Sequence, residues 1–193
     1  MSNTDYLTLL TEAHDFTVRN LYGGTSHCTT GLCLKQYDDA SIREACKLVQ
    51  NMLAAVHPFF ICNKCHFICL GANKLLLNNH FQPVLTTGYI LLNHCEKEYY
   101  TGREELFKQL KEIQRPMKLQ YHVCLTLGDY IIDPTYTTTH RILNPDTYPQ
   151  QESYDNRIIL FKHTAGLFEF GNDTLEYIPQ LTGASLFEHQ MFL

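Results

Sequence analysis

Apolar and polar positions alternate along residues 118–126, and this pattern predicts the first strand of a β-hairpin. A period of two is typical of a strand with one buried face. Gly128-Asp129 supplies a turn, and Pro134 ends the second strand because it cannot continue a paired ladder. A two-residue turn sets the register: Leu127 opposite Tyr130, Thr126 opposite Ile131, Leu125 opposite Ile132 and Cys124 opposite Asp133.

Apolar residues at helical spacing predict four helices. Their starts are indicated by capping residues, two of which belong to capping boxes in which a Ser or Thr precedes a Glu by three positions. The predicted helices run from Asn3 or Thr4 to about Leu21, from the Ser41/Glu44 box to about His57, from an Asn63 cap to about Leu77, and from the Thr101/Glu104 box to Ile113.

The other segments are predicted from β-forming and turn-forming residues. Residues 81–92 form a strand in which Gly88 marks a bulge or a close backbone approach, and residues 157–161 and 166–170 form two more strands. Residues 58–61 are short and extended, and residues 25–39 and 134–153 are loops. Residues 172–193 have no clear period beyond a short helix near the end. The elements together predict an α+β fold with helices packed on an antiparallel sheet.

Length and charge narrow the class of protein. A chain of 193 residues with 45% hydrophobic content predicts a single domain over residues 1–193. A formal net charge of −5 without a basic run argues against nucleic-acid binding. Neither a signal peptide nor a run of about 20 apolar residues is present, so we expect no membrane association and a cytoplasmic protein.

Cys65 is the candidate nucleophile among eight cysteines, which we expect to be thiols rather than disulfides in a cytoplasmic chain of this size. With Asn63 as cap, Cys65 falls in the first turn of a helix. The helix dipole and the N–H groups there favour a thiolate and are natural donors to an oxyanion.

His122 and Asp133 are the candidate partners of this thiol. The predicted hairpin register places them as diagonal cross-strand neighbours on one face, where the carboxylate can orient the imidazole. This pair is half of a nucleophilic triad. The alternative is a strand histidine on the polar face that merely lies near an aspartate.

Two sequence segments carry a family resemblance: NKCHFICLGANKLLLNNHFQPVLTTGYILL and YHVCLTLGDYIIDPT. Over residues 58–136 the chain resembles the transglutaminase-like branch of the papain-like cysteine enzymes, in which a Cys opens a helix and a later His strand leads to an Asp before Pro-Thr. The usual small residue before the Cys and the usual Trp after the His are replaced here by Asn63-Lys64 and Cys124.

The resemblance implies a papain-like fold and a catalytic triad of Cys65, His122 and Asp133. We therefore expect a thiol enzyme that forms an acyl-enzyme from an amide or thioester in a peptide, a protein or a small amide. Hydrolysis by a peptidase, amidase or deamidase is the first expectation, and acyl transfer of the transglutaminase type is the alternative. The mechanism requires no cofactor, and no loop with Ca²⁺-ligand spacing is visible.

Two non-catalytic alternatives remain open. The fold can serve as a binding module, because a fold does not determine function. A structural zinc site is the other possibility, because Cys62, Cys65, His66 and Cys69 lie close in sequence, with His57 nearby. Cys28 and Cys33 are the residues available to close such a site.

Overall fold

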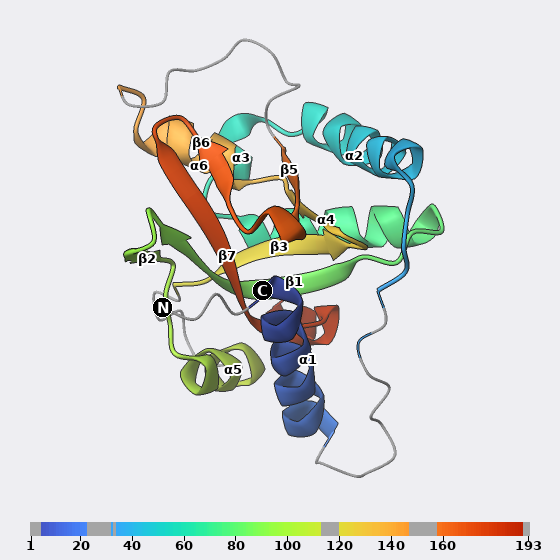
Figure 1. Ribbon diagram of the computed structural model, residues 1–193, viewed down its shortest axis with the longest axis vertical. Helices are drawn as coiled ribbons and strands as arrows, with labels where there is room; N and C mark the ends of the chain where they lie inside the picture. Colours follow the sequence, from blue (N-terminus) through green and yellow to red (C-terminus); the bar gives the residue numbers. More distant parts are fainter. Residues whose placement is uncertain (1–4, 23–31, 33, 113–119, 147–157, 191–193) are drawn as a thin grey trace. The chain divides into compact units, whose positions relative to one another are not determined.

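The computed structural model describes residues 5–22, 32, 34–112, 120–146 and 158–190. The chain is built from helices and antiparallel strands, which confirms the α+β class (Figure 1). It divides into two compact units. Unit 1 comprises residues 1–33, 86–122 and 163–193, and unit 2 comprises residues 34–85 and 123–162.

Unit 1 contains an antiparallel ladder of four strands in the order β2-β1-β7-β6. Strand β1, the predicted strand at 81–92, spans Val84–Leu92 and is central. Its neighbours are β2 (Glu96–Glu98) and β7 (Asp173–Thr182), and β6 (Phe168–Phe170) pairs with β7. Two of these elements were not predicted: β2 is three residues long, and β7 lies where the sequence shows no clear period.

Helices α1 (Tyr6–Tyr22) and α5 (Arg103–Lys111) complete unit 1, with the 3₁₀ helices η2 (His163–Ala165) and η3 (Ala184–Gln190). Helix α1 packs on β7 (Figure 1). The Thr182 backbone N–H donates to Thr17 Oγ1 at 3.1 Å, and His14 Nδ1 lies 3.1 Å from Thr182 Oγ1. The buried aliphatic side chains of this unit include Leu10, Ala13, Ile90, Leu106, Leu110, Leu175 and Leu181.

Gly88 lies at a bulge in β1, as predicted. The register between β1 and β7 shifts between Thr87 and Gly88. A Cβ atom on Gly88 would lie 2.0 Å from the Ile178 carbonyl oxygen, so only glycine fits at this backbone approach. The bulge fixes the position of β7 along β1.

Unit 2 contains the predicted hairpin. Strand β3 (His122–Leu127) begins at the boundary of the two units and pairs with β4 (Tyr130–Asp133), and β4 pairs with β5 (Ile159–Lys162). The predicted register is confirmed for Leu127–Tyr130, Thr126–Ile131 and Leu125–Ile132. All six residues of β3 are buried. The prediction of one polar face was therefore wrong, because His122 and Thr126 are buried together with the apolar residues of the strand.

Four helices pack in unit 2. They are α2 (Asp39–Ala54), α3 (Pro58–Ile61), α4 (Cys65–Asn78) and α6 (Tyr136–Leu143). Helix α2 packs on α4, and α3 packs on α6. The buried side chains of α2 lie at the predicted helical spacing: Ile42, Ala45, Val49 and Leu53.

Two segments expected to lack helix are helical. Residues 58–61 form α3 rather than an extended run, because Pro58 presets a helical φ at the first position and His57 Nδ1 accepts from the Phe59 N–H. The predicted loop at 134–153 contains α6, which buries Tyr136 and the three threonines after it. The remainder of that loop, from residue 147, lies outside the described residues.

Three predicted helix caps were wrong. Helix α2 is capped by Asp38, whose side chain accepts from the Ser41 N–H at 2.8 Å, rather than by Ser41. Helix α5 is preceded by Gly102, and Thr101 Oγ1 donates instead to the Gln120 carbonyl. Helix α4 is preceded by Lys64, because Asn63 adopts a left-handed φ of 57°. The first-helix cap at residues 3–4 lies outside the described residues.

Candidate active site

Cys65 is the first residue of α4 and is half-buried. The Lys64 side chain makes no capping hydrogen bond, and the first intrahelical contact at this end is the Ile68 N–H to the Lys64 carbonyl at 3.1 Å. The N–H groups of the first turn therefore point out of the helix beside Cys65. This end of the helix carries the positive pole of the dipole.

Asp133 ends β4 and is completely buried. Its Oδ1 accepts from the Thr135 N–H at 2.9 Å, from Thr135 Oγ1 at 3.1 Å and from the Tyr136 N–H at 3.1 Å. Three donors on one carboxylate oxygen hold the side chain in one orientation at the start of α6. The Asp-Pro-Thr sequence thus builds a turn that positions the carboxylate.

Two buried thiols of unit 2, Cys69 and Cys124, lie near both Cys65 and Asp133. Cys69 Sγ donates to the Val123 carbonyl at 3.1 Å, which fixes α4 against β3. Burial, and secondarily the charges of Asp133 and Cys65, raise the pKa of both Cys69 and Cys124 well above the usual thiol value. Both thiols thus stay protonated near neutral pH. Each of them is a neighbour of both Cys65 and Asp133.

His122 begins β3 and is the last residue of the middle segment of unit 1. Its side chain is only 6% exposed. Within unit 1 its ring lies 5.5 Å from the ring of Tyr99 and 6.1 Å from that of Tyr177. Cys65 and Asp133 therefore belong to unit 2. His122 is the last residue of unit 1 before the chain continues into unit 2 at Val123.

His66, directly after Cys65, is a second imidazole close to the candidate thiol. Burial and then the positive charge of Lys64 lower the pKa of His66 to about 4. Its ring lies 4.0 Å from that of Phe67. His66 is therefore neutral at neutral pH and is a poor source of the imidazolium that a thiolate requires.

The zinc alternative depended on cysteines and histidines near Cys62. Among the described residues there is no group of three or more Cys, His, Asp or Glu side chains arranged to hold a metal ion. Cys62 instead contacts Thr139, and its burial outweighs that hydrogen bond and raises the pKa of the thiol. Cys28 and Cys33 lie outside the described residues.

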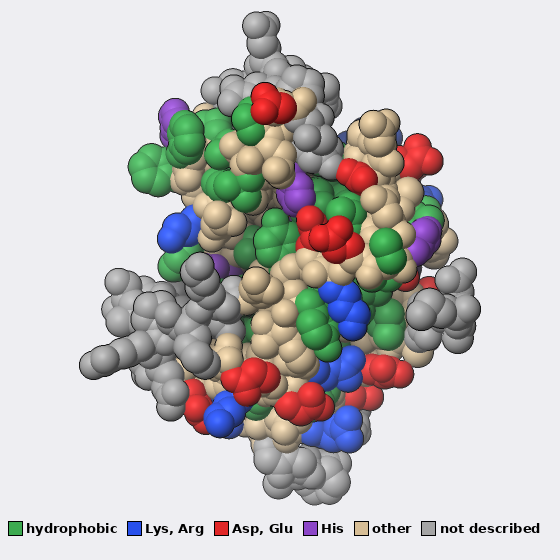
Figure 2. Space-filling model, turned by 90° about the vertical axis from the view of Figure 1, so that its left-hand side faces the viewer, with side chains coloured by type: hydrophobic (Ala, Val, Ile, Leu, Met, Phe, Trp, Pro, Cys, Tyr) green, Lys and Arg blue, Asp and Glu red, His purple; other side chains and the backbone are tan. Residues whose placement is uncertain are grey.

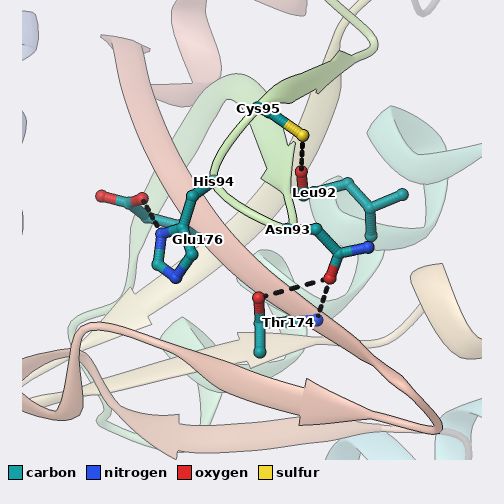
Figure 3. A network of polar contacts seen from close by, with 6 residues as sticks. All are labelled: Leu92, Asn93, His94, Cys95, Thr174 and Glu176. Atoms are coloured by element: carbon teal, nitrogen blue, oxygen red, sulfur yellow. Dashed lines mark hydrogen bonds and ion pairs between the residues drawn. The ribbon is translucent and has the colours of Figure 1, made fainter.

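A second grouping of thiol, imidazole and carboxylate occurs at the β1–β2 turn, and the sequence does not indicate it. His94 Nδ1 lies 3.8 Å from Glu176 Oε2, and Cys95 Sγ lies 3.8 Å from the Leu92 carbonyl oxygen. Figure 3 shows the sulfur directed toward Leu92 and the imidazole directed toward Glu176, away from each other. Asn93 links the same turn to Thr174 by two hydrogen bonds: the Thr174 N–H donates to Asn93 Oδ1, and the Asn93 N–H donates to the Thr174 carbonyl. This grouping stabilises a turn and does not align a nucleophile with a base.

The residues around His122 were also absent from the sequence predictions. Tyr99 lies 23 positions before His122 and Tyr177 lies 55 positions after it. Neither belongs to a recognisable motif. Pairing of β1 with both β2 and β7 brings these tyrosines to His122, so only the fold reveals them.

Comparison of this chain with protein-family models, with curated proteins and with solved structures finds no match. No helix in the described part of the chain combines the length and apolar character that a membrane crossing requires.

Proposed function

We propose that the chain is a thiol enzyme with a transglutaminase-like, papain-like fold that acts on an amide or thioester through Cys65, His122 and Asp133. The observation that carries this proposal is the hairpin register. Three residue pairs follow it: Leu125–Ile132, Thr126–Ile131 and Leu127–Tyr130. Continued by one position, this register predicts Cys124 opposite Asp133. His122 and Cys124 are two positions apart on one strand and share a face, so we expect Asp133 to be a diagonal neighbour of His122.

Cys65 is the thiol best suited to be the nucleophile. Burial raises the pKa of Cys46 to about 11, and the pKa values of Cys62, Cys69 and Cys124 are also raised by burial. These four thiols hold little thiolate at neutral pH. Cys65 is half-buried and is the first residue of α4, where the backbone N–H groups of the first helical turn lie beside it.

The proposed reaction follows from these positions. His122 takes the proton of Cys65, and the thiolate attacks the substrate carbonyl carbon while Asp133 orients the imidazole. The oxyanion is stabilised by the N–H groups of the first turn of α4. His122 returns the proton to the leaving amine or thiol, leaving a thioester on Cys65. Water then attacks the thioester, which restores the thiol and releases a carboxylic acid; an amine in place of water gives acyl transfer.

The residues that precede Cys65 in the sequence expose aromatic side chains, and this exposure supports an apolar substrate. Phe59 and Phe60 in α3 are 70% and 72% exposed, and His57 stacks on Phe59 with ring centroids 5.6 Å apart. Hydrophobic side chains gather in the upper part of the face in Figure 2. The exposed aromatic rings of Phe59 and Phe60 suit an apolar acyl group.

The experiment that tests the nucleophile is alkylation by iodoacetamide across pH, with the label located by peptide mass spectrometry. Cys95 is exposed and serves as an internal reference. We expect Cys65 to react ahead of Cys95 under mildly acidic conditions, because a thiolate paired with imidazolium persists there. His122→Ala should remove this advantage. Equal rates for Cys65 and Cys95 in the unaltered chain would contradict the proposal.

Asp133→Asn tests the orienting role. Asparagine keeps an acceptor for the donors of Thr135 and Tyr136 but lacks the charge that fixes the imidazole tautomer. We expect turnover to fall by about 10²- to 10⁴-fold, with a loss of about 1 kcal/mol in the free energy of unfolding. Steady-state kinetics and urea denaturation measure the two effects. Unchanged turnover would exclude Asp133 from the triad.

A further inference from the structure

Tyr99 has an unusual backbone conformation. Five described residues other than glycine have positive φ, and four of them are asparagine or histidine: Asn63, His80, Asn93 and His94. These residue types are enriched in the left-handed region. Tyr99, with φ of 59°, is the exception. A bulky side chain in this region is strained, and such strain persists only where the surrounding structure imposes it.

The Tyr99 ring lies beside the ring of His122. The two ring centroids are 5.5 Å apart with an interplanar angle of 37°. The next residue, Tyr100, has different partners: its ring lies 4.9 Å from that of Tyr89, and Lys97 Nζ lies 4.2 Å from its centroid. Tyr99 and Tyr100 therefore contact different aromatic rings, because the left-handed conformation of Tyr99 changes the direction of the chain between them.

The strand pairing places Tyr99 and Tyr177 on either side of β1. In the ladder of unit 1, Ile90 of β1 is the register partner of Glu98 on one side and of Tyr177 on the other. Tyr177 is thus held within β7, and Tyr99 follows Glu98 directly at the end of β2. The edge-to-face contact of Tyr177 with His122, at 6.1 Å and 60°, completes the pair of aromatic contacts.

We propose that Tyr99 is a positioning residue for His122, holding the imidazole ring in the orientation that proton transfer from Cys65 requires. The catalytic importance of this orientation rests on the function proposed above. The contact itself does not depend on that function. Tyr99 touches neither the thiol nor the reacting carbonyl in this proposal and acts only through the histidine ring.

The test compares Tyr99→Leu and Tyr99→Phe with Tyr100→Leu as the matched control. Tyr100 is the adjacent tyrosine, is 42% exposed and pairs with Tyr89. The direct readout is the NMR shift of the His122 ring protons, which sense the ring currents of neighbouring aromatic groups. We expect Tyr99→Leu to move these resonances and to lower kcat by about 10- to 100-fold with little change in KM. Tyr99→Phe should preserve both, and Tyr100→Leu should change neither.

Unmoved His122 resonances in Tyr99→Leu, or an equal effect of Tyr100→Leu, would overturn the positioning role. If Tyr99→Leu does not fold, Tyr99→Gly replaces it, because glycine adopts the left-handed conformation without strain and also lacks the ring. A wild-type chain whose Cys65 shows no enhanced reactivity would refute the proposed enzyme. The NMR comparison would still decide whether Tyr99 orients His122, so the two failures are distinguishable.

Discussion

Cys65→Ala should abolish turnover and leave the fold intact. The variant removes the atom that forms the acyl-enzyme, so we expect kcat to fall by about 10⁴-fold or more. Cys65 is half-buried at the start of α4, and alanine is a good helix former, so the free energy of unfolding should change by no more than about 1 kcal/mol.

The matched control for this variant is Cys95→Ala. Cys95 is an exposed thiol near the β1–β2 turn and takes no part in the proposed reaction. Turnover of a panel of thioester and amide substrates with apolar or charged acyl groups measures activity, and circular dichroism during heating measures stability. Turnover in Cys65→Ala equal to that of the unaltered chain would exclude Cys65 as the nucleophile. Loss in both variants would indicate a general effect of cysteine removal.

Gly88→Ala should be the most destabilising single-methyl substitution among the glycines described here. The added Cβ would lie 2.0 Å from the Ile178 carbonyl oxygen and 3.2 Å from the Gln180 nitrogen. Both atoms belong to the backbone of β7, so relief requires breaking the β1–β7 ladder at its bulge. We expect a loss of more than about 4 kcal/mol, which corresponds to a fall of roughly 10 °C or more in Tm.

Gly102→Ala provides the comparison. Gly102 precedes α5, and no atom lies within 4 Å of a Cβ built there. Its φ of −58° is accessible to alanine, so its Tm should change by only a few degrees. Thermal melting of the two variants side by side separates the effect of the added methyl group from that of lost chain flexibility. A Gly88→Ala variant as stable as Gly102→Ala would contradict the close backbone approach.

The hairpin was predictable because its information is local. Gly128 has the left-handed φ of 57° that the turn needs, and the alternating residues around it fix the register. The start of α4 at Cys65 was predicted for the wrong reason, since Asn63 is not its cap. The segment after Asp133 was mistaken for a loop because consecutive threonines have little helix propensity, and their burial in α6 depends on the fold.

The environment of His122 was not predictable from the sequence. The contacts with Tyr99 and Tyr177 depend on a three-residue strand and on a strand near the C-terminus without a clear alternating pattern. Similarly, the short sequence spacing of Cys62, Cys65, His66 and Cys69 left a shared metal site open as an alternative. Burial and hydrogen bonds instead give these side chains different neighbours, such as Thr139 for Cys62 and Val123 for Cys69.

The discontinuous composition of unit 1 has a consequence for synthesis on the ribosome. Helix α1 ends at Tyr22, yet its packing partner β7 begins at Asp173, about 150 residues later. At about 5–20 residues per second, β7 is made roughly 8–30 s after the helix. During that interval Leu10 and Ala13 lack the surface that buries them in the finished protein. The nascent chain therefore keeps the apolar face of α1 exposed until β7 is made.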